Sequence, residues 1–156
     1  MNYKKIEIYG INDDNKLDSL LMEIAKQHNL TPKLWTNNYK ASDKDIDEAV
    51  KRIKNTGSNN LFLAIAEDDK NNMQGFIWAH KQEKVPDSVM ILSLYTSENY
   101  REQGIATNLK SLLEEWCRLE GIKTIETTVH YNNSSMIALN QKLGYTPGML
   151  HMTKTL

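Results

Sequence analysis

The residues best suited to chemistry form a short turn, Arg101-Glu102-Gln103-Gly104-Ile105-Ala106-Thr107, between an apolar run and a helical pattern. Gly104 and Ala106 leave the main chain open to close approach by a bound group. Free amide groups at the start of a helix attract anions, and the helix dipole adds to this attraction. Arg101 contributes a positive side chain. The turn therefore has the composition of a phosphate-binding loop, or of an ordinary strand-to-helix turn whose glycine serves packing.

Two common phosphate loops do not fit this turn. A nucleotide P-loop requires a Lys-Ser or Lys-Thr pair after its last glycine, and Gly104 is followed by Ile105-Ala106. The dinucleotide-binding pattern requires three spaced glycines and an acidic residue on a later strand. The turn therefore indicates a different phosphorylated ligand, if it binds one.

A second group of polar residues follows the next apolar run. Asn133 and Asn140 are seven positions apart, which in a helix is two turns, so both amides lie on one face about 10 Å apart. Two amides at this spacing suit an extended polar ligand. The alternative is that Asn132 or Asn133 caps a helix and that Asn140 is a solvated helix residue.

The bulk properties narrow the class of protein. The chain has 156 residues and a net charge of −1, with both signs interspersed, so we expect one domain over residues 1–156. The sequence shows no basic stripe of the kind that binds nucleic acid or a membrane surface, and no apolar run is long enough to span a bilayer. The lone cysteine, Cys117, lies in an apolar helical pattern and is expected to be a small core residue and not a nucleophile. These features predict a cytoplasmic location.

Hydrophobic periodicity predicts alternating strands and helices. The expected strands are 4–10, 61–66, 73–80, 89–96, 122–129 and 149–156, with a turn at Asn12 to Asn15 after the first. The expected helices are 17–28, 42–54, 105–120 and 132–143. The predicted order is βααβββαβαβ, a mixed α/β fold.

The two polar groups together resemble the GNAT (GCN5-related) N-acetyltransferase family. In that family an Arg-x-x-Gly-x-Ala loop precedes a strand and a helix with a characteristic pattern. The matching residues here are Val129, Asn133, Met136, Ile137, Leu139, Lys142, Leu143, Gly144 and Tyr145. The order of elements also matches, so the resemblance covers essentially the whole chain.

The resemblance implies a twisted, mostly antiparallel mixed sheet with helices on both faces. It also implies that acetyl-CoA lies in a wedge between the strands ending at Thr96 and Val129. The pantetheine arm would follow the strand that ends at Thr96, and the diphosphate would lie on the Gly104 turn. The residues that it assigns to the cofactor are Leu94, Tyr95, Thr96, Arg101, Gln103, Gly104, Ile105, Ala106, Thr107, Asn133 and Asn140. It implies no metal.

The catalytic residues depart from the family pattern. The family often uses a tyrosine to protonate the departing thiolate, and Asn140 stands at that position. An amide cannot act as an acid near neutral pH, so we expect Asn140 to donate a hydrogen bond to the sulfur. Other hydroxyl groups that could replace the acid are those of Tyr95, Tyr131 and Tyr145, although Tyr145 also suits packing at the helix end.

The general base is left open by the sequence. The strand before the turn, Ser88 to Leu94, contains no acid, although many members of the family carry a glutamate there. The alternatives are Asp87, Glu126, His130 and His80.

The acceptor is not named by any motif. Segments 29–41 and 80–88 are expected to shape its pocket, and Trp35 and Tyr39 form either a wall of that pocket or a pin to the core.

The resemblance implies an acetyl-CoA-dependent N-acetyltransferase acting on a primary amine of a small molecule or peptide. A non-catalytic acyl-CoA-binding module of the same fold is the first alternative, and a phosphate-binding protein unrelated to CoA is the second. We expect a homodimer, because two-fold homodimers are the commonest oligomers of soluble proteins.

Overall fold

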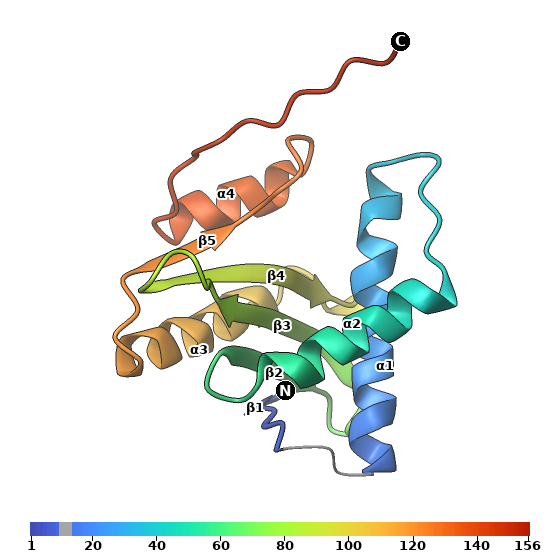
Figure 1. The fold of residues 1–156 in the computed structure, drawn as a ribbon, viewed down its shortest axis with the longest axis vertical. Helices are drawn as coiled ribbons and strands as arrows, with labels where there is room; N and C mark the ends of the chain where they lie inside the picture. Colours follow the sequence, from blue (N-terminus) through green and yellow to red (C-terminus); the bar gives the residue numbers. More distant parts are fainter. Residues whose placement is uncertain (10–13) are drawn as a thin grey trace.

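The computed structural model describes residues 1–9 and 14–156 and forms a mixed α/β fold (Figure 1). Its strands are β1 (Asn2–Lys5), β2 (Leu61–Glu67), β3 (Met73–Lys81), β4 (Ser88–Thr96) and β5 (Thr124–Thr127). Its α-helices are α1 (Asn15–Leu30), α2 (Asp43–Thr56), α3 (Ile105–Leu119) and α4 (Ser134–Lys142). Two short 3-10 helices, η1 (Thr31–Leu34) and η2 (Glu98–Tyr100), lie after α1 and after β4.

The strands form one sheet in the order β1-β2-β3-β4-β5. The first three pairings are antiparallel, and β4 pairs with β5 in parallel through the α3 crossover. This arrangement confirms the predicted mixed and mostly antiparallel sheet.

Helices cover both faces of the sheet, as expected (Figure 1). On one face, α1 and α2 pack against alternate residues of β2 and β3, including Leu63 and Trp78. On the other face, α3 packs against the intervening residues, including Phe62 and Ile77. Both sets are buried because β2 and β3 are apolar at nearly every position, as the central strands of a two-sided sheet must be.

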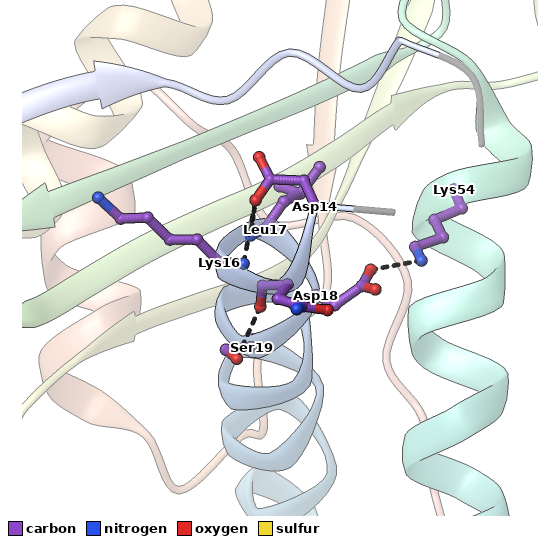
Figure 2. A network of polar contacts seen from close by, with 7 residues as sticks. Asp14, Lys16, Leu17, Asp18, Ser19 and Lys54 are labelled. Atoms are coloured by element: carbon purple, nitrogen blue, oxygen red, sulfur yellow. Dashed lines mark hydrogen bonds and ion pairs between the residues drawn. The ribbon is translucent and has the colours of Figure 1, made fainter. Parts of the chain in front are cut away.

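Local polar contacts fix where α1 begins and join it to α2 (Figure 2). The Asp14 carboxylate accepts hydrogen bonds from the main-chain N–H groups of Lys16 and Leu17, at 3.0 and 3.3 Å, and so caps α1. Lys54 of α2 binds Asp18 in the first turn of α1 at 2.6 Å.

The chain ends differ from the expected pattern. The first strand was expected at 4–10 and lies at Asn2–Lys5; Gly10 and the predicted turn residues Asn12 and Asp13 lie outside the described residues. β5 covers only half of the expected 122–129. The expected closing strand at 149–156 is wrong, since that segment has no strand structure and extends away from the sheet (Figure 1).

The expected closing strand does not form because weak alternation at a chain end does not supply a partner strand. Met149 and Leu156 are fully exposed, and β5 offers only a four-residue edge.

Among the residues that the structure describes, no helix is both long and apolar enough to cross a membrane.

Candidate functional site

β4 and β5 pair over only part of the length of β4, and the side of β4 beyond the last pair is called the wedge here. The two strands pair only from Ser88 opposite Thr124 to Ile91 opposite Thr127, after which β4 continues to Thr96 without β5 beside it. At the same point β4 contains a bulge, because Ile91 lies opposite Ala79 and Ser93 lies opposite Trp78. A bulge bends its strand and increases the local twist, so it directs the end of β4 away from β5.

The far half of β4 therefore exposes main-chain groups on its open edge. The Ser97 N–H donates to the Gln74 carbonyl of the β3 side at 2.8 Å. Successive residues of a strand direct their N–H and C=O groups to opposite edges, so Tyr95 faces β3 and Leu94 and Thr96 face the wedge.

The three residues assigned to the pantetheine arm thus divide into two kinds. Leu94 and Thr96 present peptide groups to the wedge, and the Thr96 carbonyl accepts a hydrogen bond from Arg101 Nε at 3.4 Å. Tyr95 instead stacks its ring on Phe76, with ring centroids 5.7 Å apart, and lies against the α1–α2 side of the core.

The turn at the start of α3 is the second part of the site. Glu102 and Gly104 both have positive φ angles, 61° and 83°, which turn successive N–H groups in one direction. Gly104 is the N-cap residue of α3 and has no side chain to accept from the first turn. No oxygen of the described residues accepts a hydrogen bond from the N–H groups of residues 103–107.

This start differs from those of the other α-helices. Asp14 caps α1, Ser42 and Asp45 form a capping box at α2, and Asn133 caps α4. Within the described chain, α3 is the one α-helix whose first turn has no side-chain cap. Its donors are therefore available to an anion, which is the arrangement predicted for the phosphate-binding alternative.

A close contact between β3 and α3 fixes the position of this turn. A Cβ atom on Gly75 would lie 2.8 Å from Ile105 Cγ2 and 2.9 Å from the Tyr95 carbonyl oxygen. Only a glycine leaves enough space for the first turn of α3 to pack this closely on the sheet beside the open end of β4.

Helix α4 places the two asparagines on the other side of the wedge. Asn133 Oδ1 accepts from the Met136 N–H at 3.2 Å, so the capping alternative is confirmed, and its Nδ2 group is left to act as a donor. Asn140 is only 6% exposed, so the alternative of a solvated residue is wrong. Its buried Oδ1 has no hydrogen-bond partner among the described residues.

Tyr145 lies against α3 and is poorly suited to acid catalysis. Lys110 Nζ lies 4.2 Å from the centroid of its ring. Burial raises the pKa of the Tyr145 phenol to about 12, with smaller contributions from Glu114 and Cys117. Transfer of its proton to a thiolate whose acid has a pKa near ~8.5 would be uphill by roughly 5 kcal/mol.

Sequence reasoning missed Lys110, which is 1% exposed on the inner face of α3. Lys110 lies three residues before Leu113 and seven before Cys117, so helical periodicity places it on the apolar face of α3. Its burial could therefore have been predicted from the sequence. Burial lowers the pKa of Lys110 to about 8, against a smaller opposing effect of Glu114. Cys117 is 3% exposed and burial raises its pKa to about 11, in agreement with the predicted core role.

Aromatic rings join two loops that are distant in sequence. Trp35, just after η1, stacks on His130 with ring centroids 4.8 Å apart, and His130 stacks on Tyr131 at 4.7 Å. The segment 29–41 therefore meets the loop between β5 and α4 through Trp35, and its role as a wall of the acceptor pocket stays a prediction. Segment 80–88 lies at the closed end of the wedge, where the Lys123 N–H donates to the Asp87 carbonyl.

Similarity to known proteins extends over most of the chain. A family model described as the acetyltransferase (GNAT) family matches residues 24–145. The uncharacterised N-acetyltransferase YdgE of Bacillus subtilis is 27% identical over 139 residues, which is 87% of each chain.

Two solved structures illustrate the structural similarity. A Staphylococcus aureus protein assigned to the GNAT acetyltransferases is 26% identical, with a TM-score of 0.67 over 81% of this chain and 98% of that one. The structure of AAC(6')-Iy with a CoA bisubstrate analogue has a TM-score of 0.68 over 100% of both chains, at 16% identity.

Proposed function

The chain belongs to the GNAT acetyltransferase family, and from this premise we propose that it is an acetyl-CoA-dependent N-acetyltransferase. The reaction is direct transfer of the acetyl group to a primary amine of a small molecule or peptide. Residues 1–156 form the domain that carries it out. The observation that carries the proposal is the uncapped first turn of α3 beside the open edge of β4.

The residues present fit acetyl-CoA at three places. The N–H groups of residues 103–107, with Arg101 beside them, hold the diphosphate. The Leu94 carbonyl and the open-edge peptide groups of Thr96 pair with amides of the pantetheine arm, and Asn133 Nδ2 donates to the same arm from α4. AAC(6')-Iy, which has the same fold at 16% identity, is solved in complex with CoA, and this supports CoA as the class of ligand.

The chemistry requires alignment of the two reactants and donors at the thioester. The Leu94 N–H, at the open edge just past the bulge, stabilises the developing oxyanion. Asn140 Nδ2 donates to the sulfur as it leaves, and solvent supplies the proton. Tyr145 is assigned a packing role because of its buried phenol.

The acceptor enters beside the stack formed by Trp35, His130 and Tyr131. Tyr131 is 67% exposed, so the stack ends on an accessible ring face that suits an amine-bearing group. Small-molecule amines are the first acceptors to test, because AAC(6')-Iy and a second aminoglycoside acetyltransferase from a soil sample share the fold.

A non-catalytic acyl-CoA-binding module is the second candidate, and one observation favours it. Asn140 replaces the residue that often serves as the acid, and its buried Oδ1 lacks a partner in the described part of the chain. A module that binds without turnover has no need of an acid at this position.

A screen of amines with detection of free CoA thiol tests the proposal. A transferase releases thiol with at least one amine faster than hydrolysis alone, whereas a binding module releases none despite binding acetyl-CoA. Thermal unfolding with acetyl-CoA, ATP and NAD in parallel separates both from a general phosphate-binding protein, because only a specific ligand raises the melting temperature by mass action.

A further inference from the structure

The proposed function leaves the proton of the acceptor amine without a destination. A primary amine with a pKa near ~10.4 is almost entirely protonated at neutral pH and has no lone pair with which to attack. Resting on that function, we propose that Glu126 is the general base, which removes this proton through Oε1, directly or through one water molecule.

Glu126 lies beside the point where the wedge opens. On β5 it is opposite Met90, and the next pair, Ile91 and Thr127, is the last before the strands separate. Its neighbour Ile125 packs on the α3 side of the sheet. Alternation along a strand therefore directs the Glu126 carboxylate to the α1–α2 face of the sheet.

Its contacts orient one carboxylate oxygen and leave the other free. Gln82 Nε2 donates to Oε2, and the buried Ser88 hydroxyl donates to the same atom at 3.4 Å. Gln82 Nε2 also contacts Ser88 Oγ at 2.8 Å, so the two partners support each other. Oε1 accepts from no group of the described residues, and Glu126 is exposed, so Oε1 can receive a proton.

The two histidines are less suitable. His80 Nδ1 lies 2.8 Å from the Lys81 carbonyl, which can only accept, so Nδ1 carries the hydrogen. His80 Nε2 then accepts from Arg52 Nη2 at 3.3 Å, which occupies its only lone pair. His130 Nδ1 accepts from the Asn132 N–H at 3.2 Å, which places the hydrogen of the neutral ring on Nε2.

Asp87 is also poorly placed. It precedes β4 and lies four residues before Ile91, at the closed end of the wedge. Glu126, opposite Met90, lies three positions closer to the point where the strands separate, and its carboxylate has both an orienting network with Gln82 and Ser88 and an unoccupied oxygen. The charged and titratable groups at neighbouring positions are Arg52 on α2, His80 on β3 and Lys123 and His130 on either side of Glu126.

The step balances as follows. The acceptor arrives as an ammonium ion, Glu126 takes one proton from it, and solvent later removes that proton from the carboxyl group. The neutral nitrogen forms the C–N bond with the carbonyl carbon as the C–S bond breaks. The nitrogen then loses its second proton, and the departing thiolate takes up a proton to become the CoA thiol.

The test compares Glu126→Gln with the parent and with Glu115→Gln, a matched change at an exposed carboxylate on α3, outside the segments assigned to the cofactor and the acceptor. Thiol release with the best amine is measured from pH 6 to pH 10, and acetyl-CoA affinity by calorimetry. We expect kcat/KM of Glu126→Gln to fall ~100-fold at pH 7. It should recover as the pH approaches the pKa of the acceptor amine, because more of the amine is then already neutral. The activity of Glu115→Gln and the acetyl-CoA affinity of both variants should equal those of the parent.

Other outcomes separate the two proposals. If the parent releases thiol and Glu126→Gln equals it, or is slower by one factor at every pH, Glu126 is not the base while the transferase assignment stands. If acetyl-CoA affinity falls with activity, Glu126 acts on binding and the proposal is overturned. If the parent releases no thiol with any amine, the proposed function fails and the base assignment with it.

Discussion

Replacement of Lys110 by methionine should make the protein more stable. Lys110 is 1% exposed, and the folded structure lowers its pKa from 10.5 to about 8. That lowering corresponds to roughly 3 kcal/mol of folding free energy lost at pH 7, where the unfolded chain carries the charge freely. The cation–π contact with Tyr145 offsets about 1 kcal/mol, so the variant should gain about 2 kcal/mol.

The dependence on pH gives the sign of the effect. Between pH 8 and 10.5 the unfolded state binds more protons at Lys110 than the folded state, so the parent gains stability as the pH rises. Burial raises the pKa of Cys117 from 9.0 to about 11, which lowers stability over pH 9 to 11. This second effect is common to both proteins and cancels in their difference.

Urea unfolding followed by circular dichroism at pH 7, 8.5 and 10 measures that difference. The advantage of Lys110→Met should be largest at pH 7 and should shrink steadily above pH 8. A variant less stable than the parent at pH 7, or a difference that does not change with pH, would refute the reasoning that Lys110 is destabilised by burial.

Three further changes test the site. Gly75→Ala should lower the free energy of unfolding by about 1–3 kcal/mol, because the added Cβ lies 2.8 Å from Ile105; denaturant titration showing no loss would contradict this. Asn140→Ala should lower kcat about 10-fold at saturating substrates, through loss of a hydrogen bond to the thiolate, whereas an unchanged kcat would remove Asn140 from catalysis. Trp35→Ala should raise the acceptor KM about three- to tenfold and leave acetyl-CoA affinity unchanged, and the opposite pattern in steady-state kinetics and calorimetry would place Trp35 at the cofactor.

The sequence predicted the elements that carry strong periodicity and clear boundaries. The runs in β2 and β3, the stripe of α3 and the Gly104 turn are local features, so the residues alone determine them. The closing strand could not be predicted correctly, because strand formation depends on a partner edge that local alternation does not reveal.

The candidate site was predictable where it consists of main-chain groups and caps. The Gly104 turn and the Asn133 cap depend on neighbouring residues in sequence. The bulge after Ile91, the burial of Asn140 and the stacking of Trp35 on His130 depend on contacts between distant elements. Periodicity contains no information about such contacts.

The central claim is that the first turn of α3 binds the diphosphate of acetyl-CoA. Calorimetric titration with acetyl-CoA and with S-acetylpantetheine, which lacks the diphosphate, tests it most directly. We expect acetyl-CoA to bind at least about 100-fold more tightly, since two charge-assisted hydrogen bonds contribute about 3 kcal/mol. Equal affinities, or no heat with acetyl-CoA, would contradict the assignment.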